Sequence, residues 1–439
     1  MLKAGFYEKN ITPPLGCDIP GFFLPRVAND VLEDLYARAV VFDDGKETVA
    51  MLAVDALGVH AALTEKILDR ASEYAGIRKE NILICATHLH TGGPFKNDTF
   101  LKADQPYLDM LSRLAADAIT LAQRRMEPVT AKFIMGHVDS ISFVRNFKMK
   151  GGYVMTNPEP NNPDIIEPCA DIDPELPVLL LCDAADRPKG AVISFACHQD
   201  CLCGEKRAYS TDFAGVMDKE LKKEYGSDFI SVFFEGACGN INHWDVFSQK
   251  GITLEHHRKM GRILATEIKS IVPEAAVLSR QDIAVKKKTL SLRKRLFTQQ
   301  QLDEAKEFLK ACEGKEIVYT EFNPESEFMK YHYAHRALRY MEDPSESYKA
   351  QLQVIRIGDC LIYAMPGELF VQFGRKIKQL SPSEHNIIAE LAFDSPGYIP
   401  TRELFQPTVY ESTLPTCQFE PEAGDEIVNK LSEMGRAIF

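Results

Sequence analysis

The sequence predicts an α/β fold in which mixed β-sheets are flanked by helices and packed into one compact unit. Short apolar runs alternate with amphipathic helical patterns through the first half of the chain. Hydrophobic residues make up 45% of the 439 residues, which is enough to bury a large core. Because no repeat, low-complexity tract or linker marks a boundary, we expect a single domain over residues 1–439.

The elements of the first half follow from their patterns. Residues 48–54 (TVAMLAV) predict a buried strand, residues 61–74 an amphipathic helix, and residues 82–86 (ILICA) the next strand. Residues 107–125 predict a long helix because apolar residues recur at three- and four-residue steps. Residues 136–177 are rich in Pro, Asn, Gly and Asp, and they predict a long ordered loop region with short strands.

The second half continues the alternation of strands and helices. The elements expected there are strands at 178–182, 191–197, 229–234, 360–365 and 387–393, and helices at 254–271 and 369–380. A charged, helix-forming stretch over residues 298–343 predicts a surface-exposed helical insertion. From the last strand to residue 439 we expect an irregular tail.

The charge balance argues against a nucleic-acid partner. Lys and Arg total 51 against 63 Asp and Glu, a formal net charge of −12, whereas phosphate binding requires a basic footprint. Two local basic runs, at 286–288 and 293–295, alternate with apolar residues. They predict the solvated edge of a sheet.

Cysteine usage and hydropathy favour a reducing, aqueous compartment. The chain has 11 cysteines, and several lie inside apolar runs, where a thiol packs as a small hydrophobe: Cys85, Cys182, Cys197 and Cys360. No apolar run approaches the roughly 20 residues of a membrane span, and no signal-peptide pattern opens the sequence. We expect a cytoplasmic protein without a transmembrane segment. A secretory signal trimmed before position 1 would leave the same sequence, so that alternative stays open.

Polar side chains follow the predicted strands, where α/β sheets gather their functional groups. His88 and His90 follow the strand at 82–86 and point to one side if the backbone stays extended. The polar residues after other strands are Asp55, His198, Asn240, Asn242, His243, Glu368 and Tyr398. Two imidazoles and a carboxylate at separate strand ends are the ligand types of a catalytic zinc site.

Each of these residues also has an ordinary structural interpretation. A His-x-His pair is more often a hydrogen-bonded pair than a metal site, and His198 alone is more often a core histidine. Glu368 would be a first-turn helix residue, Tyr398 a packed aromatic ring and Asp55 a helix cap. The convergence of several such residues favours the metal site over these interpretations.

A rival metal site lies within one short segment. Residues 197–203 (CHQDCLC) contain three thiols and an imidazole, a set that binds structural zinc in other proteins. No second Cys/His pair follows at the usual finger spacing, so we expect Cys201 and Cys203 to be packing or surface residues. Four further histidines lie on polar helical patterns and are expected at the surface: His256, His257, His332 and His335.

Several longer segments share the pattern of one known family. They are residues 10–16 (NITPPLG), 35–41 (LYARAVV), 87–94 (THLHTGGP), 195–200 (FACHQD), 209–215 (YSTDFAG), 366–375 (PGELFVQFGR), 397–401 (GYIPT) and 410–413 (YEST). On these residues the chain resembles the neutral/alkaline non-lysosomal ceramidase family, specifically its N-terminal catalytic domain. The resemblance extends over most of the chain and implies a ceramidase-like catalytic domain over residues 1–439.

The resemblance implies roles for individual residues. One zinc ion per chain would be held by four ligands: His88, His198, Glu368 and Tyr398. A zinc-bound water would attack the scissile carbonyl, His90 would handle protons beside that water, and Arg145 and Tyr410 would polarise the carbonyl.

Two departures from the family pattern matter. Where the family carries a serine with an assigned catalytic role, this chain has Asn242 in the segment 239–244 (GNINHW). Asparagine cannot act as the nucleophile in acyl transfer, so water must attack directly, and we expect Asn242 to bind substrate together with Asn240 and Asp55. The pattern of the smaller C-terminal β-domain of larger ceramidases is absent from the 439 residues.

The sequence therefore predicts a zinc-dependent hydrolase that cleaves an amide (N-acyl) bond in a small-molecule or lipid-like substrate, which need not be ceramide. Two alternatives stay open: a catalytically silent metal- or ligand-binding protein, and an enzyme that uses the metal for ester hydrolysis or proton abstraction. His90 and Tyr410 favour an enzyme, because a binding site has no need of a base beside the metal.

Overall fold

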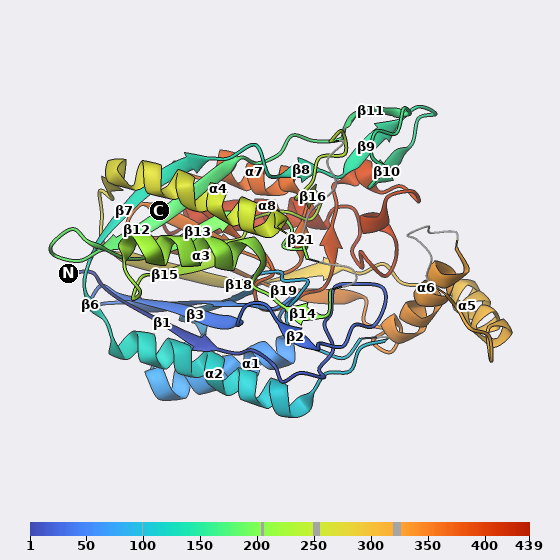
Figure 1. The fold of residues 1–439 in the computed structure, drawn as a ribbon, viewed down its shortest axis with the longest axis horizontal. Helices are drawn as coiled ribbons and strands as arrows, with labels where there is room; N and C mark the ends of the chain where they lie inside the picture. The colour runs from blue at the N-terminus through green and yellow to red at the C-terminus, as the bar shows by residue number, and fades with distance from the viewer. Residues whose placement is uncertain (99, 203–205, 249–254, 319–325) are drawn as a thin grey trace.

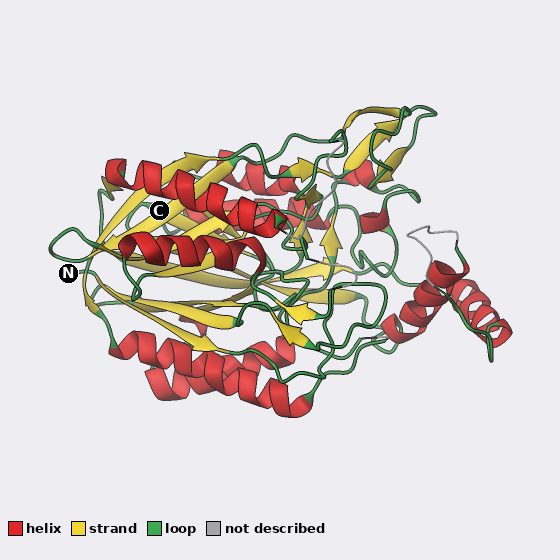
Figure 2. Cartoon of the chain, viewed as in Figure 1, coloured by secondary structure: helices red, strands yellow, loops and turns green. Residues whose placement is uncertain are grey.

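The computed structural model describes residues 1–439 except 99, 203–205, 249–254 and 319–325. It confirms the predicted fold class, with three main mixed sheets flanked by helices (Figures 1 and 2). The first sheet has the order β5-β4-β3-β1-β6, with β1 Lys3–Asn10, β3 Tyr36–Asp43, β4 Thr48–Val54, β5 Ile82–Ala86 and β6 Glu127–Pro128. The second has the order β15-β13-β12-β7-β17, with β7 Thr130–His137, β12 Glu175–Cys182, β13 Pro188–Phe195, β15 Ile230–Glu235 and β17 Ala276–Val277. The third has the order β18-β19-β20-β22, with β18 Ile283–Arg293, β19 Ser347–Ile357, β20 Cys360–Ala364 and β22 His385–Ala389.

Each main sheet buries one face against a pair of helices and the other against the neighbouring sheets (Figure 1). The pairs are α1 Ala61–Ala75 with α2 Gln105–Arg124, α3 Asp212–Tyr225 with α4 His256–Ile271, and α7 Val371–Leu380 with α8 Ala423–Arg436. The central apolar cluster draws side chains from all three sheets. These doubly covered strands are apolar on both faces, which is why they appear as continuous hydrophobic runs in the sequence.

The same strand–helix–strand unit occurs once in each main sheet. Helix α1 connects the parallel strands β4 and β5, α3 connects β13 and β15, and α7 connects β20 and β22. The polar residues noted in the sequence follow the carboxyl ends of these six strands. The fold therefore brings segments from three sheets to one region, where ligand sites of α/β proteins form.

Short strand pairs beyond the main sheets hold the intervening loops together. They are β2 Asp30–Val31 with β14 Ala208–Tyr209, β8 Phe143–Val144 with β16 Ile241–Asn242, β21 Glu368–Leu369 with β23 Tyr398–Ile399, and a three-stranded sheet of β10 Val154–Thr156, β9 Asn146–Met149 and β11 Ile165–Pro168. Four 3₁₀ turns complete the described elements: η1 Lys79–Asn81, η2 Val272–Glu274, η3 Arg402–Leu404 and η4 Tyr410–Ser412.

Two helices project from one end of the molecule, α5 Gln299–Ala311 and α6 Glu327–Tyr340 (Figure 1). Thr298 and Gln301 form a capping box that starts α5. That this region is an insertion into the family's domain stays a prediction. Among the described residues, no helix combines the length and the apolar character that crossing a bilayer demands.

The expected irregular tail was wrong, because α8 forms near the end of the chain. Ile427, Val428, Leu431 and Met434 are buried on one side of this helix, at the spacing of an amphipathic helix that covers a sheet. The last strand of the third sheet also ends earlier than expected, at Ala389, because Leu391 and Phe393 adopt left-handed backbone angles (φ 56° and 66°). The prediction for the basic runs was correct in that β18 is an edge strand, but Lys294 is buried and Lys287 is largely enclosed rather than solvated.

Candidate metal centre

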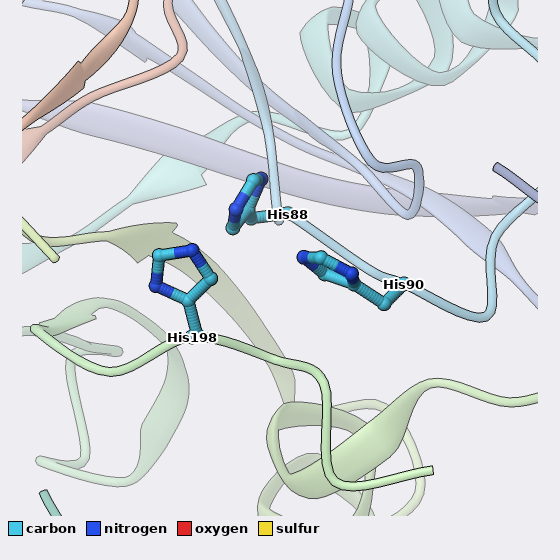
Figure 3. Close-up of side chains that lie close together, drawn as sticks. All are labelled: His88, His90 and His198. Carbon is cyan, nitrogen blue, oxygen red and sulfur yellow. The ribbon is translucent and has the colours of Figure 1, made fainter. Parts of the chain in front are cut away.

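Three imidazoles converge beyond the strand ends: His88, His90 and His198 (Figure 3). One ligand atom of each ring lies within 4.8 Å of the other two, and the ring centroids of His88 and His198 are 4.6 Å apart. The two segments are joined by a parallel bridge between Leu89 and Gln199, where the His90 amide donates to the Gln199 carbonyl at 3.1 Å. Loops after β5 and β13 thus form one structural unit.

Hydrogen bonds set the tautomer of all three rings. In each ring Nδ1 lies 2.8–3.0 Å from a backbone carbonyl oxygen. The accepting carbonyls, in the order His88, His90 and His198, belong to Leu57, Gly21 and Cys238. A carbonyl only accepts, so Nδ1 carries the proton and Nε2 keeps its lone pair. This arrangement is typical of metal-ligating histidines, whose other nitrogen is held by a second partner.

His88 reaches the cluster through a turn rather than through an extended strand. Strand β5 ends at Ala86, and His88 itself has a left-handed backbone (φ 63°). Such a conformation costs on the order of 1 kcal/mol or more for a residue with a Cβ atom. The two rings lie together, as expected. The reason given was wrong, because a turn at His88, rather than the alternation of an extended strand, brings them to the same side.

Glu368 faces the histidines from the third sheet. Its Oε2 lies 3.3 Å from Nε2 of His88 and 3.5 Å from Nε2 of His198, and its side chain is 12% exposed. The sequence predicted a first-turn helix residue, which was wrong: Glu368 belongs to β21, and α7 begins only at Val371. Burial alone would raise the pKa of Glu368, but His88 and His198 hold it well below its ordinary value.

Tyr398 lies beside Glu368 and His198. The β21–β23 register pairs Glu368 with Tyr398, and the tyrosine hydroxyl is 3.5 Å from Nε2 of His198. The two rings are stacked, with 15° between their planes. Burial, followed by the charge of Glu368, raises the pKa of Tyr398 well above its ordinary value.

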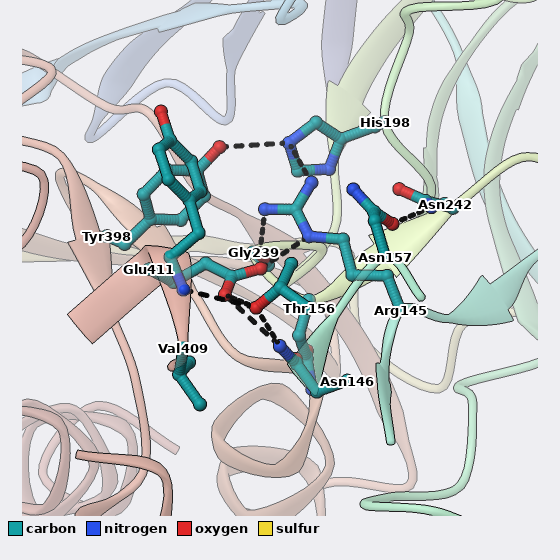
Figure 4. Close-up of polar contacts among 12 residues, drawn as sticks. Arg145, Asn146, Thr156, Asn157, His198, Gly239, Asn242, Tyr398, Val409 and Glu411 are labelled. Carbon is teal, nitrogen blue, oxygen red and sulfur yellow. Dashed lines mark hydrogen bonds and ion pairs between the residues drawn. The ribbon is translucent and has the colours of Figure 1, made fainter. Parts of the chain in front are cut away.

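Arg145 extends the cluster toward the end of the chain (Figure 4). Its Nε donates to Glu411 Oε1 at 2.6 Å and its Nη2 to the Gly239 carbonyl at 2.7 Å. Its Nη1 lies 3.4 Å from Nε2 of His198, and its guanidinium carbon lies 5.3 Å from the centroid of the Tyr398 ring. The arginine is thereby fixed with one nitrogen directed at the cluster.

Glu411 is the residue that sequence reasoning missed. It is fully buried, and its second oxygen accepts from Thr156 Oγ1 at 2.7 Å and from Asn146 Nδ2 at 3.1 Å. These bonds hold the carboxylate that anchors Arg145 (Figure 4). Its place beside Tyr410 in the YEST segment was the available signal, but a buried ion pair that spans 266 positions cannot be inferred from spacing.

The donor atoms of the cluster fit a divalent cation. Nε2 of His88 and Oε2 of Glu368 are buried, and neither has a hydrogen-bond partner among the described residues. Leaving such atoms unsatisfied costs about 1–3 kcal/mol each, more for a charged group. Two imidazoles and a carboxylate beside a phenol are the nitrogen and oxygen donors that zinc takes in catalytic sites.

His90 differs from the other two histidines in its surroundings. Its Nδ1 donates to the Gly21 carbonyl, and no ion pair between His90 and Glu368 accompanies those of His88 and His198 among the described residues. Burial, followed by the adjacent His88, lowers the pKa of His90 to about 3. The ring is therefore neutral at neutral pH, with a lone pair on Nε2.

The predicted substrate-binding residues have mainly internal partners. Asp55 is buried and accepts from Nη1 of Arg38 and from the amide of Tyr36, both at 2.8 Å. Asn240 accepts from the Val371 amide at 2.8 Å, at the start of α7. These bonds account for Asp55 and Asn240 structurally, and their contact with substrate stays a prediction.

Asn242 lies closer to the reactive groups. It belongs to β16, and its side-chain nitrogen donates to Asn157 Oδ1 at 2.7 Å, next to Arg145 in Figure 4. Its role toward substrate likewise stays a prediction.

An aromatic wall adjoins the cluster beyond Tyr410. Tyr410 lies beside Tyr398, with ring centroids 5.9 Å apart. The wall consists of Phe23, Phe100, Phe328 and His332, with neighbouring centroids 5.4–6.4 Å apart. Phe23 contacts Tyr410 edge to face at 6.0 Å. Helix α6 supplies two members of the wall, so the projecting helices reach the vicinity of the site.

The expectation of surface imidazoles on α4 and α6 was wrong for two of the four residues. His257 is 2% exposed and His332 is 9% exposed, because each faces the body of the protein from its helix. His256 and His335 are partly buried. Of the rival cysteine site, Cys203 lies outside the described residues.

Comparison with known proteins relates this chain to one family by sequence and to one fold by structure. Residues 12–244 match a family model described as "Neutral/alkaline non-lysosomal ceramidase, N-terminal". A neutral ceramidase from Pseudomonas aeruginosa is 25% identical over 219 residues, which cover 47% of this chain and 31% of that protein. The chain thus spans less than a third of the curated relative it matches.

Two solved structures share the fold over almost the whole chain. The crystal structure of neutral ceramidase from Pseudomonas aeruginosa aligns with a TM-score of 0.75 and 18% identity, covering 99% of this chain and 74% of that one. A ceramidase complexed with C2 aligns with a TM-score of 0.74 and 17% identity, covering 99% and 75%. At this identity the likeness establishes the architecture.

Proposed function

The chain belongs to the neutral/alkaline non-lysosomal ceramidase family, and from this premise we propose that it is a zinc-dependent hydrolase of the amide bond in an N-acyl, lipid-like substrate. The observation that carries the proposal is the convergence of His88, His198 and Glu368 from three separate strand ends. Their lone pairs face one another, and no hydrogen bond satisfies Nε2 of His88 or Oε2 of Glu368 among the described residues.

We assign the metal to His88, His198 and Glu368, with Tyr398 as a fourth and weaker ligand. When bound, zinc supplies Lewis-acid polarisation and a water of lowered pKa. The Tyr398 phenol suits the role of the weaker ligand. Its hydroxyl lies 3.5 Å from Nε2 of His198, and its raised pKa keeps it neutral unless a bound cation displaces the proton.

Arg145 and Tyr410 are the proposed donors to the scissile carbonyl oxygen. A cation and a phenol aimed at the developing oxyanion stabilise it most in a buried site, where water does not screen the charge. Arg145 is 6% exposed and is held rigidly by Glu411, so it needs no reorganisation during the reaction. This rigidity supports its assignment as a preorganised electrostatic group.

His90 is the proposed proton acceptor from the attacking water and proton donor to the leaving amine. The Gly21 carbonyl fixes its tautomer, which presents Nε2 to the cluster. Asn242 offers no hydroxyl, and its side-chain nitrogen is occupied by Asn157, so the nucleophile is water and no acyl-enzyme forms.

The aromatic wall supports an apolar acyl or alkyl group in the substrate. Phe23, Phe100, Phe328 and His332 form a contiguous aromatic cluster next to Tyr410. An apolar substrate group that extends from the scissile bond to this wall would be buried there. Its burial would stabilise the complex by roughly 25 cal/mol per Å² of apolar surface removed from water.

The test is a substrate panel with a metal control. Purified protein is assayed on N-acylsphingosines and other N-acyl amines of increasing acyl length, and on matched esters, before and after chelation and after addition of Zn²⁺. We expect amide hydrolysis that chelation abolishes and Zn²⁺ restores. Hydrolysis that is insensitive to chelation, or turnover of the esters alone, would contradict the proposal.

A further inference from the structure

A second cluster of metal-ligating side chains lies beside the candidate metal centre: Cys201, His243 and His256. One ligand atom of each lies within 4.8 Å of the other two. Cys201 follows β13, His243 follows β16, and His256 is the first residue of α4. Cys201 and His243 are 8% and 4% exposed, and His256 is partly buried. None of the three has a role in the proposed amide hydrolysis.

The closest polar contacts of the two imidazoles leave the same nitrogen available in each. His243 Nε2 lies 3.1 Å from Oδ1 of Asp200, and His256 Nε2 lies 2.8 Å from the carbonyl oxygen of His243. Both partners accept, so each Nε2 carries a proton and each neutral ring keeps its lone pair on Nδ1. An imidazole whose far nitrogen is held by a carboxylate or a carbonyl is prepared for a metal at the near nitrogen.

One of these lone pairs is buried without a partner. Nδ1 of His243 makes no hydrogen bond with any described residue, and the ring around it is almost fully enclosed. A satisfied core histidine would not leave such an atom, because an unpaired buried acceptor costs about 1–3 kcal/mol. This nitrogen is the observation that points to a ligand.

Packing explains only part of the position of Cys201. Its sulfur lies 3.4 Å from Sδ of Met260, which is a reasonable contact for a small hydrophobe. This contact does not explain why two imidazoles lie beside the sulfur. The sequence alone suggested a packing residue. The two imidazoles that join it in the fold come from positions 42 and 55 residues later in the chain, beyond the reach of a spacing rule.

We propose that Cys201, His243 and His256 form a second metal site that takes one borderline-soft divalent cation such as Zn²⁺. A thiolate and two imidazoles select such a metal over Mg²⁺ or Ca²⁺, which require oxygen ligands. Bonds of about 2.0–2.3 Å separate tetrahedral ligands by about 3.3–3.8 Å. Closing from the limit of 4.8 Å to these separations therefore demands a movement of at most about 1.5 Å.

Binding at this site is an exchange of a proton for a metal. The Sγ–H bond of Cys201 breaks, a sulfur–metal bond forms, the proton goes to solvent, and nothing is oxidised or reduced. A thiol binds a metal as the thiolate, so metal and proton compete for the sulfur. Affinity should accordingly increase as the pH rises.

The second metal would hold together segments that also shape the first site. Nε2 of His243 lies 3.1 Å from Oδ1 of Asp200, and Asp200 follows the proposed metal ligand His198 by two residues. Fixing His243 therefore fixes a carboxylate next to the candidate metal centre. We assign the second site a structural role, since its three ligands join the segments after β13 and β16 to the start of α4.

Cobalt substitution tests the proposal independently of activity. None of the proposed ligands of the candidate metal centre is a thiolate, so a thiolate-to-Co²⁺ charge-transfer band in the near ultraviolet that depends on Cys201 reports on the second site. Four forms of the metal-depleted protein are titrated with Co²⁺: the unmodified protein, Cys201→Ala, His88→Ala and Cys182→Ser. Cys182→Ser is the control, because it alters another buried thiol. We expect the band in all but Cys201→Ala. The zinc content should fall from two to one per chain in Cys201→Ala and in His88→Ala.

Two outcomes would overturn the second site. One is the absence of a thiolate band in the unmodified protein, and the other is a band that persists in Cys201→Ala. If that variant does not fold, His256→Gln replaces it, since this side chain is partly buried and its loss should weaken Co²⁺ binding at least tenfold. This test does not measure amide hydrolysis. The second site can therefore be confirmed or refuted whether or not the proposed function is correct.

Discussion

Glu368 and Tyr398 are direct partners in the short parallel sheet of β21 and β23, so the backbone register sets the spacing between two of the four proposed metal ligands. The two strands follow β20 and β22, which are themselves parallel neighbours in the third sheet. His88 and His198 come from the corresponding ends of the other two sheets. The candidate metal centre is thus assembled from three equivalent corners of the fold, and each corner contributes ligands from the segment just beyond a strand of a main sheet.

The first prediction concerns the first metal. His88→Ala and Glu368→Gln should each lower zinc affinity by more than the 10–100-fold that loss of an outer partner typically costs. The reason is that each substitution removes one of the donor atoms that would bind the metal directly. Metal content and Zn²⁺ titration of folded protein measure the effect. His335→Ala, on the projecting helix α6, is the matched control and should retain its zinc. Unchanged affinity in both ligand variants would contradict the assignment.

The second prediction concerns Glu411 as a positioning residue. Glu411→Ala leaves the buried Arg145 guanidinium without its carboxylate, and breaking a buried pair in this way costs about 3–5 kcal/mol of folding stability. We also expect kcat to fall with the zinc content unchanged, because Arg145 would no longer be aimed at the substrate carbonyl. Urea unfolding, steady-state kinetics and metal analysis check the three effects.

The control for this prediction is an exposed ion pair. Glu422 pairs with Arg402 at 2.8 Å on the surface, so Glu422→Ala should leave both the stability and kcat nearly unaltered. Conservative Glu411→Asp should recover part of kcat if its carboxylate still reaches Arg145. An equal loss in Asp and Ala variants would indicate a packing role instead.

The strands that deliver the site were predictable, because each lies between two apolar layers and is apolar on both faces. The predicted bounds of β4 and β5 are identical to those observed, and α1 differs by one residue. Hydrophobic periodicity did not reveal α3 or α8. Helix α3 begins with the turn residues of the STDFAG segment, and α8 has a Gly at each end that weakens its helical pattern.

The long-range relations of the site could not be predicted from the residues alone. The polar strand ends indicated that His88, His198 and Glu368 would share a region, but the strand β21 around Glu368 depends on pairing with Tyr398, 30 positions later. The partner of Arg145 and the imidazoles around Cys201 likewise come from distant segments. Such contacts arise from the packing of sheets, and no local pattern encodes them.

The third prediction is a pH dependence of stability at Lys287. Its ammonium lies 3.8 Å from the centroid of the Phe393 ring, and burial lowers its pKa from 10.5 to about 8. Between these values the unfolded chain binds a proton that the folded protein does not, so stability should rise as the pH increases from about 8 toward 10.5. Below about 8 both states are protonated, and this contribution to the slope vanishes.

The measurement is the free energy of unfolding in urea across this pH range. Lys287→Met should remove the upward slope, while Lys288→Met, at the exposed neighbouring position, should leave it in place. If the upward slope persists in Lys287→Met, another titrating group is responsible for the pH dependence.

The fourth prediction concerns the packing of α8 against α7. Gly424 lies where a Cβ atom would come within 2.1 Å of Cζ of the Phe373 ring, and Phe373 is itself buried. Gly→Ala inside a helix usually stabilises by roughly 0.5–1 kcal/mol, but here overpacking should dominate and destabilise by about 1–3 kcal/mol. Urea unfolding of Gly424→Ala decides the sign, and a stabilised variant would show that the two helices can separate at little cost.

The last prediction distinguishes the proposed base from the metal ligands. His90→Ala should lower kcat on the amide substrate by on the order of 10²–10⁴-fold, the usual worth of general acid–base assistance, while zinc stays bound. His90 shares the cluster with His88 and His198, so the metal content of the variant is the decisive readout. If zinc is lost together with activity, His90 is a ligand. If activity persists in full, another group handles the protons.

The same reaction should proceed without a covalent intermediate. Because Asn242 has no hydroxyl and its amide is bonded to Asn157, we expect no burst of amine release and no diversion of the acyl group to hydroxylamine. Asn242→Ser introduces a hydroxyl at the position in question and is the informative companion to His90→Ala. If water is the nucleophile, this serine should not become acylated, and mass spectrometry of rapidly quenched protein should detect no adduct. An acyl group trapped on the unmodified protein would show that a side chain, rather than water, attacks the substrate.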